Sequence, residues 1–194
     1  MEENMKKALI LLLLAICLVA AMSCTKASDK VAEKHSLIVF FSHSGNTKAV
    51  AEHMNTIISH SEMFEIVVAE PYSQDMDAVL ARGRNEFENN LRPELQQTFD
   101  DIAKYDVIYI GYPIWFSSVP MAVLTFLETH DMTGKTIVPF STRGGGEIGE
   151  SVDRIRAATP DSKVLDGFHD INRANYGQAT ELTDIWFADF DIKK

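Results

Sequence analysis

Apolar and polar positions follow two alternating periodicities along the chain. Short apolar runs predict strands buried on both faces, and apolar residues three or four positions apart predict helices. The predicted strands are residues 37–41, 63–69, 105–111, 135–140 and 164–168. The predicted helices are a first one from Asn46, three over 75–91, 120–128 and 147–158, and a last one carrying Leu182 to Phe190. Strands that alternate with helices predict an α/β fold with a parallel sheet covered on both faces.

One of the predicted strands contains a proline. Pro139 lies within the run 135–140 and cannot donate a backbone hydrogen bond to a neighbouring strand. We therefore expect this strand to end early.

The N-terminal segment does not follow the strand and helix pattern. Lys6 and Lys7 precede an apolar run over residues 8–22, and Ser23 and Cys24 follow it. A basic start, an apolar stretch and small residues form the layout of a secretory signal. The apolar run is short for a membrane span, so we expect an exported protein.

Residues 21–24 resemble the cleavage site of bacterial lipoproteins, although Ala21 stands where leucine is usual. This resemblance implies that Cys24 becomes a lipidated first residue and that the lipid is the only membrane anchor. A signal without lipidation, either cleaved or retained, is the alternative. The expected organisation is a signal peptide over 1–23, a linker over 24–35 and a folded domain over 36–194.

Composition narrows the class of partner. The 194 residues are 46% apolar and carry a formal net charge of −10. Such a surface repels nucleic acid and anionic lipid, and it suits docking to a basic protein patch. Cys17 and Cys24 are the two cysteines. The folded part therefore offers no disulfide, zinc thiolate site or thiol nucleophile, and no histidine and carboxylate cluster has metal-ligand spacing.

The first candidate binding loop follows the first predicted strand. Its residues are Ser42, His43, Ser44, Gly45, Asn46 and Thr47. Free backbone N–H groups at a helix start, together with hydroxyl donors, form a cradle for a phosphate. His43 either helps to neutralise that phosphate or faces solvent. An ordinary capped helix is the alternative to a phosphate site.

Two further loops are expected at the same edge of the sheet, where ligands of parallel α/β folds bind. The second contains Tyr112, Pro113, Ile114, Trp115 and Phe116, and the third contains Thr142, Arg143, Gly144, Gly145 and Gly146. Aromatic side chains beside a polar cradle indicate a planar ring ligand, although they also cover sheet edges or bind proteins. The glycines of the third loop either present backbone N–H groups or form a flexible turn.

Together, these three loops resemble those of the flavodoxin family, in order and spacing. The resemblance implies a three-layer sandwich with a five-stranded parallel sheet in the order 2-1-3-4-5, and FMN as cofactor. The phosphate would be held by Ser42, Ser44, Asn46 and Thr47, with the backbone of Gly45. Trp115 would stack on the isoalloxazine ring, with Pro113, Ile114 and either Tyr112 or Phe116 beside it. Thr142 and residues 144–146 would meet the pyrimidine edge of the ring. Two positions depart from the pattern. Phe116 stands where a second tryptophan is common, and Arg143 where a small polar residue is usual.

Three functions are compatible with these residues. The protein transfers electrons between protein partners through FMN, or it is a reductase that passes electrons from a nicotinamide or quinol to a small acceptor such as a quinone. A cofactor-free interaction module on the same fold is the third. No protein acid or base is needed for either redox role, so we assign no catalytic residue.

Overall fold

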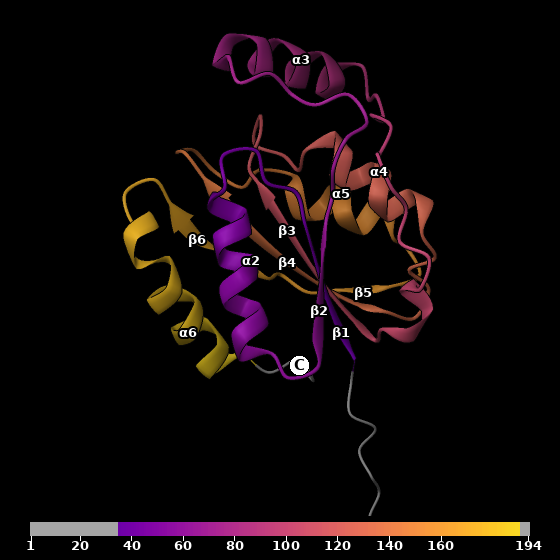
Figure 1. Ribbon diagram of the computed structural model, residues 1–194, viewed down its shortest axis with the longest axis vertical. Coiled ribbons are helices and arrows are strands. Elements are labelled where there is room, and N and C mark those ends of the chain that lie inside the picture. The colour runs from indigo at the N-terminus through magenta and orange to yellow at the C-terminus, as the bar shows by residue number, and fades with distance from the viewer. Residues whose placement is uncertain (1–34, 191–194) are drawn as a thin grey trace, which may run out of the picture. The chain divides into compact units, whose positions relative to one another are not determined.

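The structure, a computed structural model, describes residues 35–190, which fall within one compact unit (Figure 1). The predicted signal peptide, Cys24 and the linker up to residue 34 lie outside the described residues. Within residues 35–190, every helix is too short or too polar to cross a bilayer.

A parallel sheet forms the centre of the described domain. Its strands are β1 (Ser36–Phe40), β2 (Ser61–Glu65), β3 (Val107–Pro113), β4 (Thr136–Arg143), β5 (Lys163–Val164) and β6 (Phe168–Asn172). The order is β2-β1-β3-β4-β5, and β6 pairs in parallel with β4 beyond the end of β5. The predicted 2-1-3-4-5 order is confirmed.

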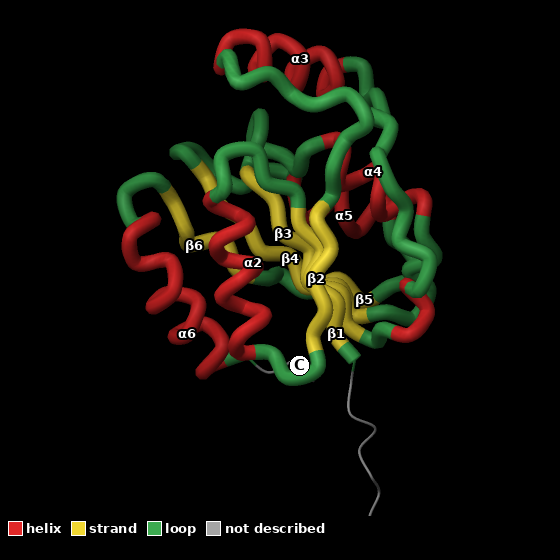
Figure 2. Tube along the Cα trace, viewed as in Figure 1, coloured by secondary structure: helices red, strands yellow, loops and turns green. Residues whose placement is uncertain are grey.

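Helices cover both faces of the sheet (Figures 1 and 2). They are α2 (Asn46–Ile57), α3 (Met76–Glu88), α4 (Met121–Thr129), α5 (Ser151–Ala158) and α6 (Ala179–Asp189), with short 3-10 turns at Ile102–Lys104 and Tyr176–Gln178. α2 and α6 pack on one face, and α4 and α5 on the other. In contrast, α3 lies beyond the carboxyl ends of the strands (Figure 1).

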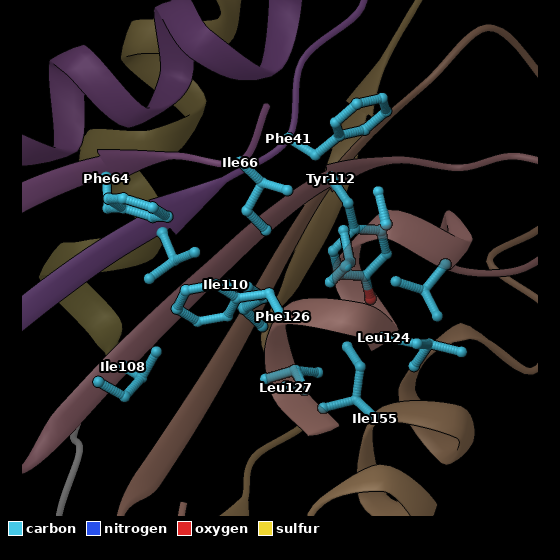
Figure 3. Packing of buried hydrophobic residues seen from close by; sticks show 14 of the residues in the cluster. Phe41, Phe64, Ile66, Ile108, Ile110, Tyr112, Leu124, Phe126, Leu127 and Ile155 are labelled. Carbon is cyan, nitrogen blue, oxygen red and sulfur yellow. The ribbon is translucent and has the colours of Figure 1, made fainter. Parts of the chain in front are cut away.

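The two cores follow directly from the alternation of side chains along β1. Leu37 and Val39 point into the cluster beneath α4 and α5, and Ile38 and Phe40 point into the cluster beneath α2 and α6. All four are almost completely buried. Figure 3 shows the first cluster. A strand buried on both faces reads as a continuous apolar run, as the sequence predicted.

The expectation that the strand containing Pro139 ends early is wrong, because β4 continues to Arg143. The missing N–H interrupts the neighbouring strand instead. The carbonyl of Ile137 accepts a hydrogen bond from Leu165, and residue 139 faces the same neighbour two positions later. Pro139 has no backbone N–H to donate to this neighbour. The strand beside β4 is therefore divided into two, β5 before this position and β6 after it.

Other boundaries differ from the prediction near the carboxyl edge of the sheet. β3 and β4 pair through Tyr112 with Ser141 and through Pro113 with Thr142, so both strands extend into segments predicted as loops. The strand predicted over residues 63–69 is β2, which covers residues 61–65 and so begins and ends earlier than predicted. Its last residue, Glu65, pairs with Phe40, the last residue of β1. α5 begins at Ser151, four residues later than predicted.

Candidate functional site

Thr142 joins the three predicted loops. Its hydroxyl lies 2.9 Å from the hydroxyl of Thr47, and both side chains are buried. Its carbonyl accepts a hydrogen bond of 2.8 Å from the backbone N–H of Ile114. Residues 95 positions apart in the chain therefore meet at one point of the carboxyl edge.

The first loop leads into the N-terminus of α2, which no side chain caps. Gly45 caps α2 with a φ of 87°, a backbone conformation that glycine adopts without strain. Within the described residues, the backbone N–H groups of Asn46 and Thr47 have no hydrogen-bond acceptor. These two donors and the helix dipole favour an anion at this position.

Side chains of the same loop are arranged around this helix start. Ser42 Oγ accepts a 3.2 Å bond from the backbone N–H of Lys48, and Asn46 Nδ2 donates to Ser44 Oγ at 3.1 Å. The ammonium group of Lys48 is engaged elsewhere, because it pairs with Glu65 at 2.9 Å. An anion here would therefore be held by amides and hydroxyls rather than by lysine.

Trp115 lies in an aromatic cluster formed with Phe41, His43 and Tyr72. The ring centroids of these residues are 5.5, 6.1 and 5.1 Å from that of Trp115, with interplanar angles between 74° and 89°. Edge-to-face contacts of this kind are attractive and fix the orientation of a ring. Through His43, the cluster links the phosphate-type loop to the aromatic loop.

The segment that follows Trp115 is a tight and strained turn. Trp115 and Ser118 exchange two backbone hydrogen bonds of 3.0 and 2.9 Å. The central residues, Phe116 and Ser117, have φ values of 52° and 54°. Left-handed conformations at residues other than glycine cost about 1–3 kcal/mol each. The turn must therefore be held by its surroundings.

One support of this turn comes from the segment before α5. Glu150 donates its backbone N–H to the carbonyl of Ser117 at 3.0 Å. Gly149 makes that approach possible, since a Cβ on this residue would lie 2.1 Å from the same oxygen. This contact explains why α5 begins after residue 149 rather than at 147.

The third loop carries a guanidinium group without a carboxylate partner. Arg143 donates from one terminal nitrogen to the carbonyl of Gly146 at 2.6 Å, and its own carbonyl accepts from the hydroxyl of Tyr176 at 2.7 Å. Its Nε is buried and has no acceptor within the described residues. Five of the seven arginines are ion-paired in the part of the chain that the structure describes, and Arg143 and Arg173 are not.

A histidine that sequence reasoning did not select lies behind the third loop. His169 Nε2 is 2.7 Å from the carbonyl of Asp166, and Nδ1 is 2.8 Å from Ser141 Oγ. Because a carbonyl only accepts, the neutral ring carries its proton on Nε2 and accepts from Ser141. Burial, assisted by the positive charge of Arg143, lowers the pKa of His169.

The donors and rings of the site match the groups of FMN. A phosphate matches the two unpaired N–H groups at the start of α2, and a flat ring matches the aromatic cluster beside them. The buried Nε of Arg143 and the buried hydroxyl of Ser118 have no partner within residues 35–190. A carbonyl oxygen of a ligand beside Arg143 would accept a hydrogen bond from its guanidinium. The residues present therefore fit the cofactor.

Not every predicted site residue lies with the others. Tyr112 is fully buried in the core, with its hydroxyl 3.4 Å from that of Ser151. Gly144 and Gly145 are exposed. Tyr72 and Ser118 also contact Trp115, and neither was predicted as a site residue. Tyr72 is separated from Trp115 by a whole helix, and no local pattern indicates that contact.

Within residues 35–190, histidine and carboxylate side chains do not gather in a group that could hold a metal ion.

The fold is an open, doubly wound α/β fold, and its carboxyl edge brings together unpaired donors and aromatic rings that fit a phosphate-bearing planar ring. The sequence profile described as flavodoxin matches residues 35–183, and the chain belongs to the flavodoxin family. A search of curated protein sequences found no match.

Solved structures of flavoproteins are similar to this chain. A candidate flavoprotein from Bacteroides eggerthii is 29% identical, with a TM-score of 0.69 over 80% of this chain and 97% of that one. A flavoprotein from Lactobacillus acidophilus, solved in complex with FMN, is 26% identical, with a TM-score of 0.64 over 76% and 99% of the two chains. A Fusobacterium nucleatum flavodoxin bound to FMN, 13% identical, has a TM-score of 0.50 over 80% and 96% and shows the fold alone.

Proposed function

We propose that this protein binds FMN non-covalently at the carboxyl edge of its sheet and transfers electrons through it. The observation that supports this most is the meeting of the three loops at Thr142, beside an open helix start and the aromatic cluster. Bound FMN supplies one- and two-electron redox chemistry, and the protein supplies binding, orientation and electrostatics.

Each part of the site has one task in this proposal. The N–H groups of Asn46 and Thr47 and the hydroxyls of residues 42–47 hold the phosphate. Trp115 lies against the ring and excludes water from it. Arg143 donates to carbonyl groups of the ring and adds a positive charge beside them. No side chain needs to transfer a proton, so no catalytic residue is assigned.

An optical titration tests the binding step. FMN fluorescence is measured while the protein is added, and the visible spectrum of the purified protein is recorded. We expect quenching that saturates at one FMN per chain and a yellow protein. Fluorescence that stays unchanged at excess protein would contradict FMN binding and favour the cofactor-free interaction module.

A second measurement separates an electron carrier from a reductase. The FMN-loaded protein is mixed anaerobically with NADH or NADPH, and flavin absorbance is followed. Slow bleaching would favour the electron carrier that we propose. Prompt bleaching would instead assign a nicotinamide-dependent reductase that passes electrons to a small acceptor such as a quinone.

The site of action follows from the N-terminal segment. We propose export and a lipid on Cys24, which would keep the FMN domain close to a membrane surface. The redox partner would then be a protein or quinone accessible from that surface. This part of the proposal rests on the residues of the signal alone.

A further inference from the structure

We infer that α3 is a positioning element of the flavin site: it holds Trp115 and the turn 115–118 in place, so FMN binding depends on residues of α3. This inference rests on the proposed FMN function. Its starting point is the position of α3 beyond the carboxyl ends of the strands (Figure 1). A helix between β2 and β3 would ordinarily cover a face of the sheet.

Gly83 is the contact point between α3 and the aromatic loop. It is buried in the middle of the helix. A Cβ on Gly83 would lie 3.2 Å from the ring of Phe116 and 3.3 Å from the ring of Trp115. Glycine lowers helix stability relative to alanine, so its presence here is explained by the close approach of the two rings rather than by helix formation.

A second link fixes the ring of Tyr72, which contacts Trp115 edge-on. The hydroxyl of Tyr72 donates to Glu86 Oε2 at 2.6 Å, and Arg82 Nε donates to Glu86 Oε1 at 2.8 Å. The guanidinium of Arg82 also lies 4.1 Å from the centre of the Tyr72 ring. Burial and the neighbouring carboxylate hold the pKa of Tyr72 far above its usual range, so the hydroxyl stays a donor.

The far end of α3 contacts the other ring of the turn. Phe87 lies 6.0 Å from Phe116 between ring centroids, and the guanidinium of Arg84 lies 5.0 Å from the Phe116 ring. Trp115 and Phe116 therefore both pack against α3. This contact also supports the left-handed conformation of Phe116.

The packing of α3 against the rest of the domain is incomplete. A hollow of about 550 Å³ lies between α3 and the segment 91–94, lined by Arg82, Asn85 and Glu86 on the helix side. The exposed side chains of Met76 and Leu80 show that the outer face of the helix is not packed either. The aromatic loop is thus one of the main surfaces against which this loosely packed helix rests, and a shift of the helix would move Trp115.

Substitutions at Gly83 test this inference. In Gly83→Ala the two rings must move by a few tenths of an ångström, and we expect the Kd for FMN to rise about tenfold, equal to about 1.4 kcal/mol. Gly83→Val should weaken binding further. The melting temperature of the apoprotein should not fall in Gly83→Ala, since alanine favours the helix. Gly177→Ala is the matched control, because a Cβ there meets no atom within 4 Å.

A tryptophan measurement separates this inference from the proposed function. Trp115 and Trp186 are the two tryptophans, so Trp186→Phe leaves Trp115 as the one reporter. In this background, Gly83→Ala should change the emission and the acrylamide quenching of Trp115 in the apoprotein. Unchanged emission together with an unchanged Kd would overturn the role of α3. Failure of the parent protein to bind FMN would overturn the proposed function, while the emission change would still test α3.

Discussion

Single hydroxyl groups connect the site to the fold. Thr47 and Thr142 are almost completely buried and form one hydrogen bond across the edge of the sheet. Removing one partner leaves the other hydroxyl buried without a partner, which costs about 1–3 kcal/mol. Removing both hydroxyls leaves no buried hydroxyl group without a partner.

We therefore expect strong coupling between Thr47→Val and Thr142→Val. Each single variant should lower the free energy of unfolding by about 1–3 kcal/mol, and the double variant should lose about 1 kcal/mol less than the sum. Urea unfolding of the four proteins measures the cycle. Losses that add within about 0.3 kcal/mol would contradict the contribution of this bond.

Arg143 is the residue whose charge should set the redox properties. Reduction makes the flavin more negative, and an unpaired guanidinium beside it stabilises the negative form. We expect Arg143→Gln to lower the two-electron reduction potential, by about 30 mV for each tenfold loss of stabilisation. Spectroelectrochemical titration measures the change. Arg156→Gln removes the same charge from an ion pair on α5 and serves as control. An equal or higher potential in Arg143→Gln would contradict this role.

Strand β6 contains His169, and the hydrogen bonds of this residue favour its neutral form. His169 is held between Ser141 and the Asp166 carbonyl, and its pKa is lowered. The unfolded chain therefore binds this proton at a higher pH than the native protein. Below the ordinary histidine pKa of 6.5, stability falls until the lowered native pKa is passed.

We expect the melting temperature of the parent protein to decrease from pH 7 to pH 5 and His169→Gln to show a shallower decrease. Thermal unfolding followed by circular dichroism gives both curves. His60→Gln, which changes an exposed histidine, corrects for general histidine effects. Parallel curves for the parent and the His169 variant would show that His169 does not contribute to the pH dependence of stability.

At the level of elements, the sequence predicted what depends on local pattern. Apolar runs identified the strands, the resemblance of the three loops to the flavodoxin family implied their order, and the hydroxyl-rich loop identified the start of α2. The place of α3 was not predictable, because an apolar stripe does not specify what a helix packs against, and Met76 and Leu80 of this stripe are exposed whereas Val79 is buried. The isolated Gly83 within that stripe was the one available signal. Pro139 was noticed, but its effect falls on the neighbouring strand through pairing that sequence alone does not show.

The whole molecule combines an acidic FMN-type domain with an N-terminal segment that we expect to carry a lipid. If Cys24 is lipidated, Cys24→Ala should move the protein from the membrane fraction to the soluble fraction, because each buried CH₂ of a lipid contributes about 0.8 kcal/mol of membrane affinity. Partition of cell extracts between detergent and aqueous phases measures this in a bacterial host. FMN binding should be unchanged, since the predicted anchor precedes the folded domain. A variant that stays in the detergent phase would contradict lipidation at this cysteine.

The left-handed pair Phe116 and Ser117 couples the stability of the turn to the flavin site. An Asn-Gly pair would adopt the same backbone with less strain than the bulky ring and the hydroxymethyl group that stand there. Replacing Phe116 by a residue that favours this turn would raise the conformational stability of the turn but remove the ring that contacts α3. Stability and cofactor affinity therefore make opposite demands on this one residue.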